Sequence, residues 1–201
     1  AVYQEMLAEK MELSVQNFNM LIQACAHYTE PTRLPSLLED RSACKVAPKS
    51  VTHGTTLKSY CSEGHDGGGR TRLGLYDRGM AVLSDMLARG VRPNAFTLAA
   101  LVKLASRSKG PDAAFQLCED LSREHGVHLT VRVYNQLIRN CTTAGQCERA
   151  LGVHVQMLTE GVRPDADTYQ LLLRSCIRWG KLSSAAELLR AAVGLGGTGH
   201  E

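Results

Sequence analysis

Residues 131–165 decide the fold, and they read VRVYNQLIRNCTTAGQCERALGVHVQMLTEGVRPD. Two apolar runs in this stretch have the three-to-four-residue spacing of a helical face. Gly145 ends the first helix, because glycine reaches left-handed backbone angles without a Cβ clash. Gly161 and Pro164 end the second helix, since proline cannot donate into a continuing helix. We therefore expect a helix–turn–helix unit whose apolar positions are Val133, Tyr134, Leu137, Ile138 and Cys141 in the first helix and Ala150, Leu151, Val153, Met157 and Leu158 in the second.

The end of this 35-residue unit recurs upstream. The sequence GVRPD at 161–165 is nearly repeated as GVRPN at 90–94, so that the two prolines lie 71 residues apart. That spacing is close to two units. A period in the thirties built from two helices is typical of an all-α solenoid of stacked repeats.

With Val131 as the first residue of a unit, the other unit boundaries follow. The repeat at 50–94 is ten residues longer than the frame, and the excess is a glycine-rich insertion at about 63–74. Its composition buries too little apolar surface for stable order, so we expect a loop between the paired helices. A partner or phosphate contact through Arg70 and Arg72 is the alternative role for it. The whole division is a second helix of a truncated repeat at 1–14, repeats at 15–49, 50–94, 95–130 and 131–165, and a C-terminal repeat with a frayed glycine-rich tail at 166–201.

Composition narrows the class of protein. The chain is 44% hydrophobic, enough for a substantial core, and carries a net charge of +3. This mild basicity permits nucleic-acid binding without arguing for it alone. No apolar run reaches the roughly 18 residues of a membrane span, so no membrane insertion is expected. Ala1 falls within a helical pattern, so we expect the natural N-terminus to lie upstream, and a transit or signal peptide remains open.

Nothing in the sequence indicates an enzyme. The seven cysteines form no Cys-x-x-Cys pair, and the seven histidines lack metal-ligand spacing. Phosphate-loop and His-Glu-x-x-His motifs are missing from the sequence. Cys25, Cys141 and Cys176 share the eleventh position of their repeats, which indicates small core residues rather than disulfides. We expect no catalytic residue, cofactor, metal or small-molecule substrate, and a reducing compartment.

The best-formed unit resembles the pentatricopeptide repeat. The resemblance rests on residues 133–138 (VYNQLI), 144–145 (AG), 150–151 (AL), Met157, Gly161 and 164–165 (PD). The tetratricopeptide repeat is the near rival, but it is 34 residues long, and the 35-residue spacing and the recurring exit sequence favour the first family. The resemblance implies a right-handed superhelix whose first helices line a concave groove. It also implies binding of single-stranded RNA in mitochondria or plastids, one base per repeat.

In this family base choice is attributed to the fifth and last residues of each repeat. Asn135 with Asp165 is the one regular pair, and the resemblance implies uridine for it. Gly54 and Ala99 occupy fifth positions without a side chain that can read a base edge. The residues that we expect to face bases are Asn19, Asn94, Asn135, Asp165 and Gln170, together with Val51 and Phe96 at second positions, where core packing is an equal alternative for Phe96.

A basic side chain recurs at the ninth position of four successive repeats. Position nine lies one helical turn beyond position five, so these charges would form a ladder along the groove. Neutralised phosphates release counterions, which favours such a ladder as an RNA contact; a solvated helix face is the alternative. The expected phosphate contacts are Lys58, Lys103, Arg139 and Arg174, with Arg132 added because its guanidinium can also stack on bases.

Three functions are compatible with these observations. The first is an organellar RNA-binding protein, mitochondrial or alternatively in plastids, that holds single-stranded RNA in its groove. The second is a structural subunit of a large organellar assembly such as a mitochondrial ribosome, in contact with ribosomal RNA and neighbouring proteins. The third is a scaffold that binds proteins alone, because solenoids present extended surfaces to peptides as readily as to RNA.

Overall fold

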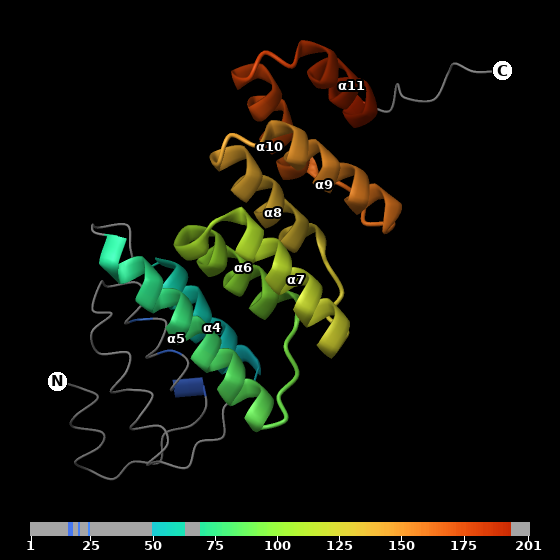
Figure 1. Cartoon of the computed structure of the whole chain (residues 1–201). Helices are drawn as coiled ribbons and strands as arrows, with labels where there is room; N and C mark the ends of the chain where they lie inside the picture. Colours follow the sequence, from blue (N-terminus) through green and yellow to red (C-terminus); the bar gives the residue numbers. More distant parts are fainter. Residues whose placement is uncertain (1–15, 18–19, 21–23, 25–49, 63–68, 194–201) are drawn as a thin grey trace, which may run out of the picture. The chain divides into compact units, whose positions relative to one another are not determined.

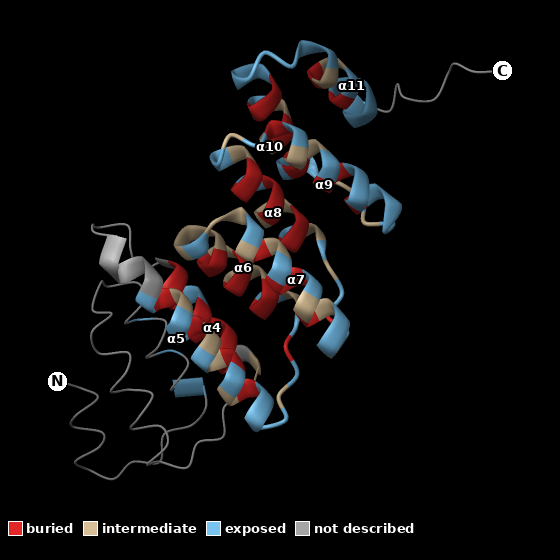
Figure 2. Cartoon of the chain, in the orientation of Figure 1, coloured by how far each residue is buried: buried red, intermediate tan, exposed pale blue. Residues whose placement is uncertain are grey.

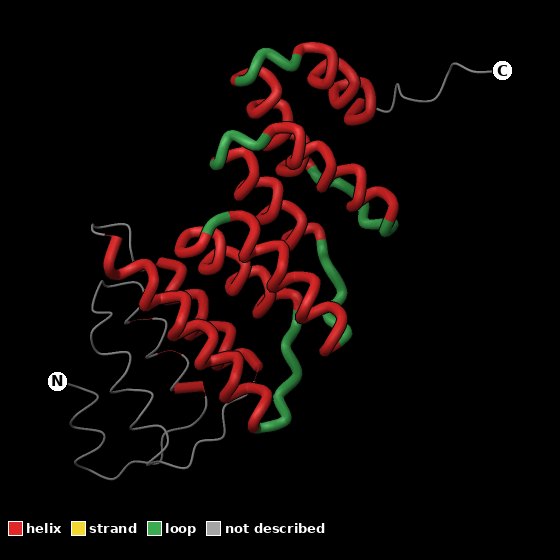
Figure 3. Tube along the Cα trace, viewed as in Figure 1, coloured by secondary structure: helices red, strands yellow, loops and turns green. Residues whose placement is uncertain are grey.

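The computed structural model describes residues 16, 17, 20, 24, 50–62 and 69–193. This part of the chain contains eight helices and no strand (Figure 3), which confirms the expected all-α class. The chain divides into an N-terminal unit, Ala1–Pro93, and a C-terminal unit, Asn94–Glu201. The expected segments 1–14 and most of 15–49 lie outside the described residues.

The N-terminal unit contains the helix pair α4 (Ser50–Ser62) and α5 (Gly69–Ala88). Its helices fall in the expected repeat at 50–94, but α5 begins earlier than the sequence suggested. Residues 69–74, expected to be loop, are helical, and only 63–68 lie outside the described residues. Leu75 is buried and anchors the helix within its first two turns, and adding residues to an existing helix costs little compared with nucleating one.

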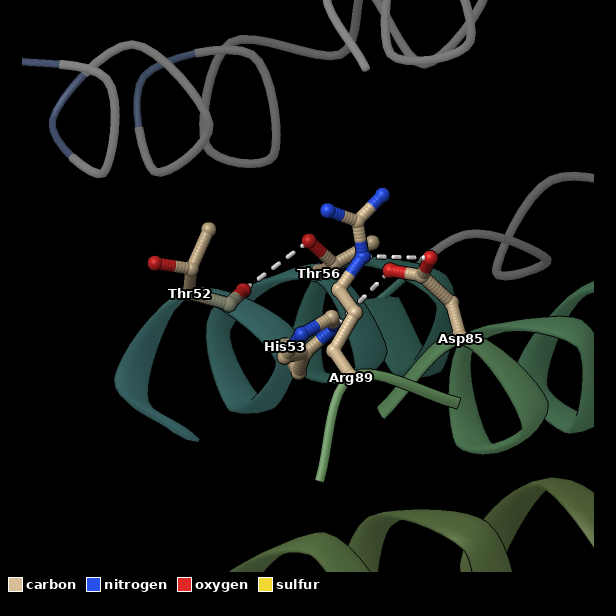
Figure 4. A network of polar contacts seen from close by, with 5 residues as sticks. All are labelled: Thr52, His53, Thr56, Asp85 and Arg89. Carbon is tan, nitrogen blue, oxygen red and sulfur yellow. Dashed lines mark hydrogen bonds and ion pairs between the residues drawn. The ribbon is translucent and has the colours of Figure 1, made fainter. Parts of the chain in front are cut away.

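The α4 helix buries an unusually polar side. Thr52, His53 and Thr56 are almost fully buried, and the Thr56 hydroxyl donates to the Thr52 carbonyl at 3.0 Å. Figure 4 shows His53 and Arg89 both directed at Asp85. The Asp85 carboxylate lies 3.9 Å from His53 Nδ1 and accepts a hydrogen bond from Arg89 Nε at 2.7 Å. The Thr56 hydroxyl is thus met by the backbone of its own helix, and His53 Nδ1 faces the Asp85 carboxylate of α5.

The C-terminal unit is a stack of three helix pairs (Figure 1). The first helices of the pairs pack on one another in succession, and each second helix also packs against the first helix of the next pair. This confirms the expected α-solenoid within the unit. In chain order the helices are α6 (Ala95–Lys109), α7 (Pro111–His125), α8 (Val131–Thr143), α9 (Cys147–Thr159), α10 (Ala166–Arg178) and α11 (Leu182–Val193).

The core of this unit runs along the stack (Figure 2). The apolar face expected for residues 131–143 is buried throughout, and Tyr134 and Ile138 are fully inaccessible. In the second helix of that pair Met157 is fully buried, but Leu158, which the sequence places in the same run, is exposed. Each fully buried large side chain stabilises the fold by about 1.5–3 kcal/mol. The largest are Leu98, Leu101, Leu104, Tyr134, Ile138, Met157 and Leu172.

The cysteines within the described residues are free and buried. Cys141 and Cys176 belong to the core, as their shared repeat position indicates, whereas Cys25 lies outside the described residues. The sulfur atoms of Cys147 and Cys176 are 3.9 Å apart, well beyond the ~2.05 Å of a disulfide. They form a thiol–thiol contact between α9 and α10.

Candidate nucleic-acid interface

Two residues thirty positions apart meet at the junction between α8 and α10. Asn135 lies in α8, and Asp165 is the residue just before α10. Asn135 Nδ2 donates to Asp165 Oδ1 at 2.9 Å. The fifth and last residues of the repeat, paired in the sequence by register alone, therefore touch in the structure. That they read a base stays a prediction.

A third residue, Thr168, joins this pair. Its hydroxyl lies 2.6 Å from Asn135 Oδ1 and 2.8 Å from Asp165 Oδ1, so its single proton is shared between two acceptors. The Thr168 backbone N–H donates to Asp165 Oδ1 at 2.8 Å, and the Asp165 N–H donates back to the Thr168 hydroxyl at 3.2 Å. This is a capping box at the start of α10.

The hydrogen bonds determine the charge state of Asp165. Partial burial alone would raise the pKa of its carboxyl, but hydrogen bonds from Asn135 and Thr168 more than offset burial and hold that pKa below its usual value. The carboxylate is therefore ionised at neutral pH.

The cluster also orients the Asn135 amide. The carbonyl oxygen faces the Thr168 hydroxyl and the amino group faces Asp165. An asparagine side chain has two N–H donors and an acceptor with two lone pairs. One N–H and one lone pair therefore remain for a ligand in the plane of the amide, and either can hydrogen-bond a base edge.

Asn94 has a related but different position. It caps α6, and its Oδ1 accepts from the Thr97 N–H at 3.0 Å and from the Thr97 hydroxyl at 3.1 Å. Asn94 is exposed, as a base-facing residue would be, but its side-chain oxygen is engaged in capping. Among the last residues of the repeats it is thus the structural counterpart of Asp165.

The remaining expected base-facing residues divide between exposed and undescribed ones. Gln170 is exposed on α10. Phe96 is 38% exposed rather than packed in the core, and the Arg132 guanidinium carbon lies 5.7 Å from the centre of its ring, within range of a cation–π interaction. Val51 lies in α4 but its side chain is not described, and Asn19 lies outside the described residues.

The expected phosphate contacts are accessible. Arg139 on α8 and Arg174 on α10 are exposed, and Lys103 on α6 is half-buried. These three helices stack in order, so the charges recur along one side of the C-terminal unit. The fourth expected phosphate contact, Lys58, is exposed on α4 and belongs to the N-terminal unit. We call the side formed by Phe96, Lys103, Arg132, Asn135, Arg139, Gln170 and Arg174 the basic face.

This arrangement combines two kinds of contact. Positions two, five and nine of a helix lie three or four residues apart and share one side. Guanidinium and ammonium groups there can neutralise phosphates, and the amide of Asn135 can bond a base between them. Asp167, also exposed at a second position, introduces a negative charge near the end of the face.

Thr168 is the residue that sequence reasoning missed. Its signal was present, because Thr at the third position after Asp165 fits the pattern of a capping box. The equivalent Thr97 after Asn94 repeats it, whereas the equivalent position after Thr130 is Val133. A threonine that follows a capping residue by three positions therefore marks where the last residue of a repeat is fixed.

Two kinds of feature are absent from the described residues. No group of three or more His, Cys, Asp or Glu side chains there could hold a metal ion. No helix in that part of the chain is long and apolar enough to cross a membrane.

Comparison with known sequences gives a consistent family. A family sequence model described as the pentacotripeptide-repeat region of PRORP matches residues 45–193, more than half of the chain. A mitochondrial pentatricopeptide repeat-containing protein of Arabidopsis thaliana is 24% identical over 177 residues, 87% of this chain and 40% of the relative. The small ribosomal subunit protein mL103 (rPPR7) of the same plant is 21% identical over 183 residues, 90% of this chain and 42% of the relative. A chloroplastic pentatricopeptide repeat-containing protein, also from this plant, is 27% identical over 128 residues, 64% of this chain and 15% of the relative.

The first two of these relatives are much longer than the chain, which spans about two fifths of their length. Among solved structures, PPR10 in complex with an 18-nucleotide psaJ RNA element matches with a TM-score of 0.73 at 26% identity, over 94% of this chain and 29% of that one. The repeat domain of A. thaliana protein-only RNase P 1, in complex with tRNA, matches with a TM-score of 0.67 at 16% identity, over 90% of each chain. At that identity the second match shows the fold alone.

Proposed function

Because the chain belongs to the pentatricopeptide repeat family, we propose that it binds single-stranded RNA along the basic face of α6, α8 and α10. The observation that carries the proposal is the Asn135–Asp165–Thr168 cluster, which holds one amide in a fixed orientation between exposed arginines. The similar protein PPR10 is in complex with an RNA element, which supports the same class of ligand here.

In this proposal the residues have separate roles. Lys103, Arg139 and Arg174 contact phosphates and supply most of the affinity, with Lys58 acting from the N-terminal unit. Asn135 bonds a base, for which uridine is expected, and Asp165 and Thr168 position its amide. Arg132 and Phe96 offer a stacking surface beside it.

The chain acts in this proposal by binding and not by catalysis. Solved neighbours include protein-only RNase P enzymes, so repeats of this fold also occur within enzymes. Incubation of labelled RNA with the chain and Mg²⁺ should leave the RNA at full length. Cleavage that persists in an independently purified preparation would contradict the binding-only role.

The test is binding of fluorescent single-stranded RNA at two salt concentrations. The wild-type chain should prefer RNA with uridine at one site. The variant with Lys58, Lys103, Arg139 and Arg174 changed to alanine should bind more weakly, with a logarithmic salt slope shallower by about 0.7 for each phosphate that the variant no longer neutralises. Thr168→Val should keep the salt slope but lose base preference, since the valine cannot orient the Asn135 amide.

Arg190→Ala is the matched control, because it removes an exposed arginine from α11, away from the basic face. It should bind RNA more tightly than Arg139→Ala does. Equal losses of RNA affinity in Arg139→Ala and Arg190→Ala would show that the arginines act only through the general charge of the chain. Binding without uridine preference, unchanged in Asn135→Ala, would remove the base-reading role.

A structural subunit of an organellar ribosome is the second candidate. The similarity to mL103, a ribosomal subunit protein, favours it, as do Gly54 and Ala99, which lack base-reading groups. This function predicts salt-sensitive RNA binding without base preference. It also predicts that the native protein sediments with ribosomal particles.

The location that we propose is an organelle, with the mitochondrion as the specific choice and the plastid as the alternative. One similar protein is named mitochondrial and another chloroplastic, which supports a location in an organelle without choosing between the two. Fractionation of the native protein with markers for both compartments tests the choice.

A further inference from the structure

A cavity lies on the side of α8 that is turned away from the basic face. It has a volume of about 420 Å³, within the range of roughly 300–1,000 Å³ for ligand sites, and lies where α7, the segment 126–130 and α9 meet. Leu137 of α8 contributes to its lining. Leu137 lies two positions from both Asn135 and Arg139, which is about 200° around the helix axis. The cavity and the basic face therefore lie on opposite sides of the same helix.

The lining has an apolar part and an acidic part. Phe115, Cys118 and Leu129 accompany Leu137, and burial raises the pKa of the Cys118 thiol to about 12, so this wall is uncharged at neutral pH. Glu119 of α7 and the Glu160 that caps α9 add two exposed carboxylates. We call this cavity the acidic pocket.

The charge of the pocket is negative because its one cation is paired elsewhere. Arg123 also lines the pocket, but its guanidinium is bonded to Asp120 at 2.9 Å, a residue outside the lining. Glu160 receives a hydrogen bond from Gln156 Nε2 at 2.9 Å, which fixes its position without neutralising its charge.

A buried hydroxyl lies next to Glu160, one of the residues that line the pocket. Tyr134 is fully buried, one turn before Leu137 on α8, and its hydroxyl makes no well-aligned hydrogen bond to any described residue. Burial, and then the neighbouring Glu160 carboxylate, raise the pKa of this hydroxyl, so it stays protonated. Buried polar groups are rarely left without a partner in native proteins. The hydroxyl can donate toward Glu160, which would hold that carboxylate in place at the pocket.

We propose that the acidic pocket binds an arginine side chain from a basic segment of a partner protein. Two carboxylates present four acceptor oxygens, and a guanidinium presents five N–H donors in a fixed fork. The apolar wall suits the aliphatic part of the side chain, which long basic residues bury while the charge stays at the rim. A phosphate group is the wrong partner, because two carboxylates repel it.

The structure already contains one example of this chemistry. The Arg149 guanidinium carbon lies 4.2 Å from the centre of the Phe115 ring, and its Nη1 also contacts the Asp112 carboxylate. An arginine placed between an aromatic ring and a carboxylate is thus a stable arrangement directly beside the pocket.

The test uses the full chain and a pool of labelled random octapeptides. Peptides retained by the wild-type chain should be enriched in arginine. A selected peptide should lose at least about tenfold in affinity for Glu119→Gln/Glu160→Gln, since bonds to charged groups are the stronger ones. Replacing its arginine with lysine should also weaken binding, because an ammonium lacks the planar fork.

Two further variants separate the pocket from general charge. Glu124→Gln removes an exposed carboxylate of α7 outside the lining and should bind the peptide as the wild type does. Tyr134→Phe removes the hydroxyl that can position Glu160, so it should weaken the peptide, but less than Glu119→Gln/Glu160→Gln does. Unchanged RNA affinity in Glu119→Gln/Glu160→Gln is expected as well.

Three results would overturn the proposal. The first is a retained pool of peptides that is not enriched in arginine. The second is a selected peptide that binds Glu119→Gln/Glu160→Gln as tightly as the wild type. The third is an equal loss of peptide affinity in that variant and in Glu124→Gln. RNA that displaces the peptide from the basic-face variants, in which the pocket is intact, would assign the cavity to nucleic acid instead.

Discussion

Asp165 holds a helix and a neighbouring side chain with one oxygen atom. Its Oδ1 accepts from the Thr168 N–H at 2.8 Å, which caps α10, and from Asn135 Nδ2 at 2.9 Å, which fixes the amide on α8. The residue that the sequence assigns to base reading thus also stabilises the junction between two repeats. Substitutions there should therefore affect folding and binding together.

The charge on Asp165 gives this junction a pH dependence. The folded state depresses its pKa, so the carboxylate stabilises the fold above the unfolded pKa of about 3.9 and loses that contribution as pH falls through the folded value. Asp165→Ala should cost about 1 kcal/mol at pH 7, as loss of a cap does. Asp165→Asn should cost less, because asparagine also caps.

Urea unfolding from pH 7 to pH 3 measures this effect. The difference in the free energy of unfolding between wild type and Asp165→Asn should be constant near neutrality and shrink below about pH 4. Asp167→Asn, which removes a carboxylate from the same first turn, controls for the helix dipole. A gap that is independent of pH would mean that the Asp165 charge contributes nothing.

Register in the sequence was enough to pair Asn135 with Asp165, because a repeat of fixed length brings its fifth and last residues to one junction. It was insufficient for Thr168, whose role depends on the direction of one hydroxyl. Asn94 illustrates the same limit. Its position was predicted, but the hydrogen bonds that engage its oxygen in capping come from the local backbone.

At the scale of helices, the ends of α8, α9 and α10 share one geometry. After α9, the Gly161 N–H donates to the Leu158 carbonyl at 3.0 Å and the Val162 N–H to the Met157 carbonyl at 2.9 Å. Gly161 has φ of +72° and Gly145 after α8 has φ of +76°. The two glycines differ in their surroundings. A Cβ on Gly145 would lie 3.0 Å from the Trp179 ring, whereas a Cβ on Gly161 would meet nothing within 4 Å.

This difference predicts unequal costs for the same substitution. Gly161→Ala should destabilise by about 1–2 kcal/mol, the cost of a left-handed alanine. Gly145→Ala should cost more, because Trp179 must also shift. Thermal and urea unfolding of both variants, alone and with Trp179→Ala, measure the excess as a coupling energy. Equal costs in the wild-type background would show that the indole moves freely.

Helix boundaries followed from the sequence where a stop signal stands at the end, as with Gly161 and Pro164. They failed at 69–74, where glycine content suggested a loop. There the helix extends backward from the buried Leu75, a tertiary anchor that composition does not reveal. The exposed Leu158 is a similar case, since a periodic pattern cannot tell which edge of an apolar stripe is covered by the next repeat.

At the scale of the whole C-terminal unit, each helix pair contacts only its neighbours. The last pair, α10 and α11, packs on α8 and α9 and not on α6 or α7. In such arrays stability is a sum of repeat and junction contributions, so a local defect acts locally. The unit is also two-sided, with arginines on one side of α8 and the acidic pocket on the other.

Leu172→Ala tests this nearest-neighbour behaviour. Leu172 is fully buried in α10, so its truncation should cost about 2–5 kcal/mol. Hydrogen exchange should speed up in α10 and α11 while α6 and α7 stay protected. Leu98→Ala in α6 is the matched control and should reverse the pattern. Uniform loss of protection from α6 to α11 in both variants would indicate a single cooperative unit.

The contact between Trp179 and Gly145 has a practical consequence. The chain contains one tryptophan, and its half-exposed indole lies over the turn of the preceding repeat. Intrinsic fluorescence excited in that indole therefore originates at a single junction, that between the repeats at 131–165 and 166–201. Separation of the two repeats would transfer the ring fully into water and move its emission to longer wavelength. The protein thus carries a built-in, label-free optical reporter of whether its last repeat is docked.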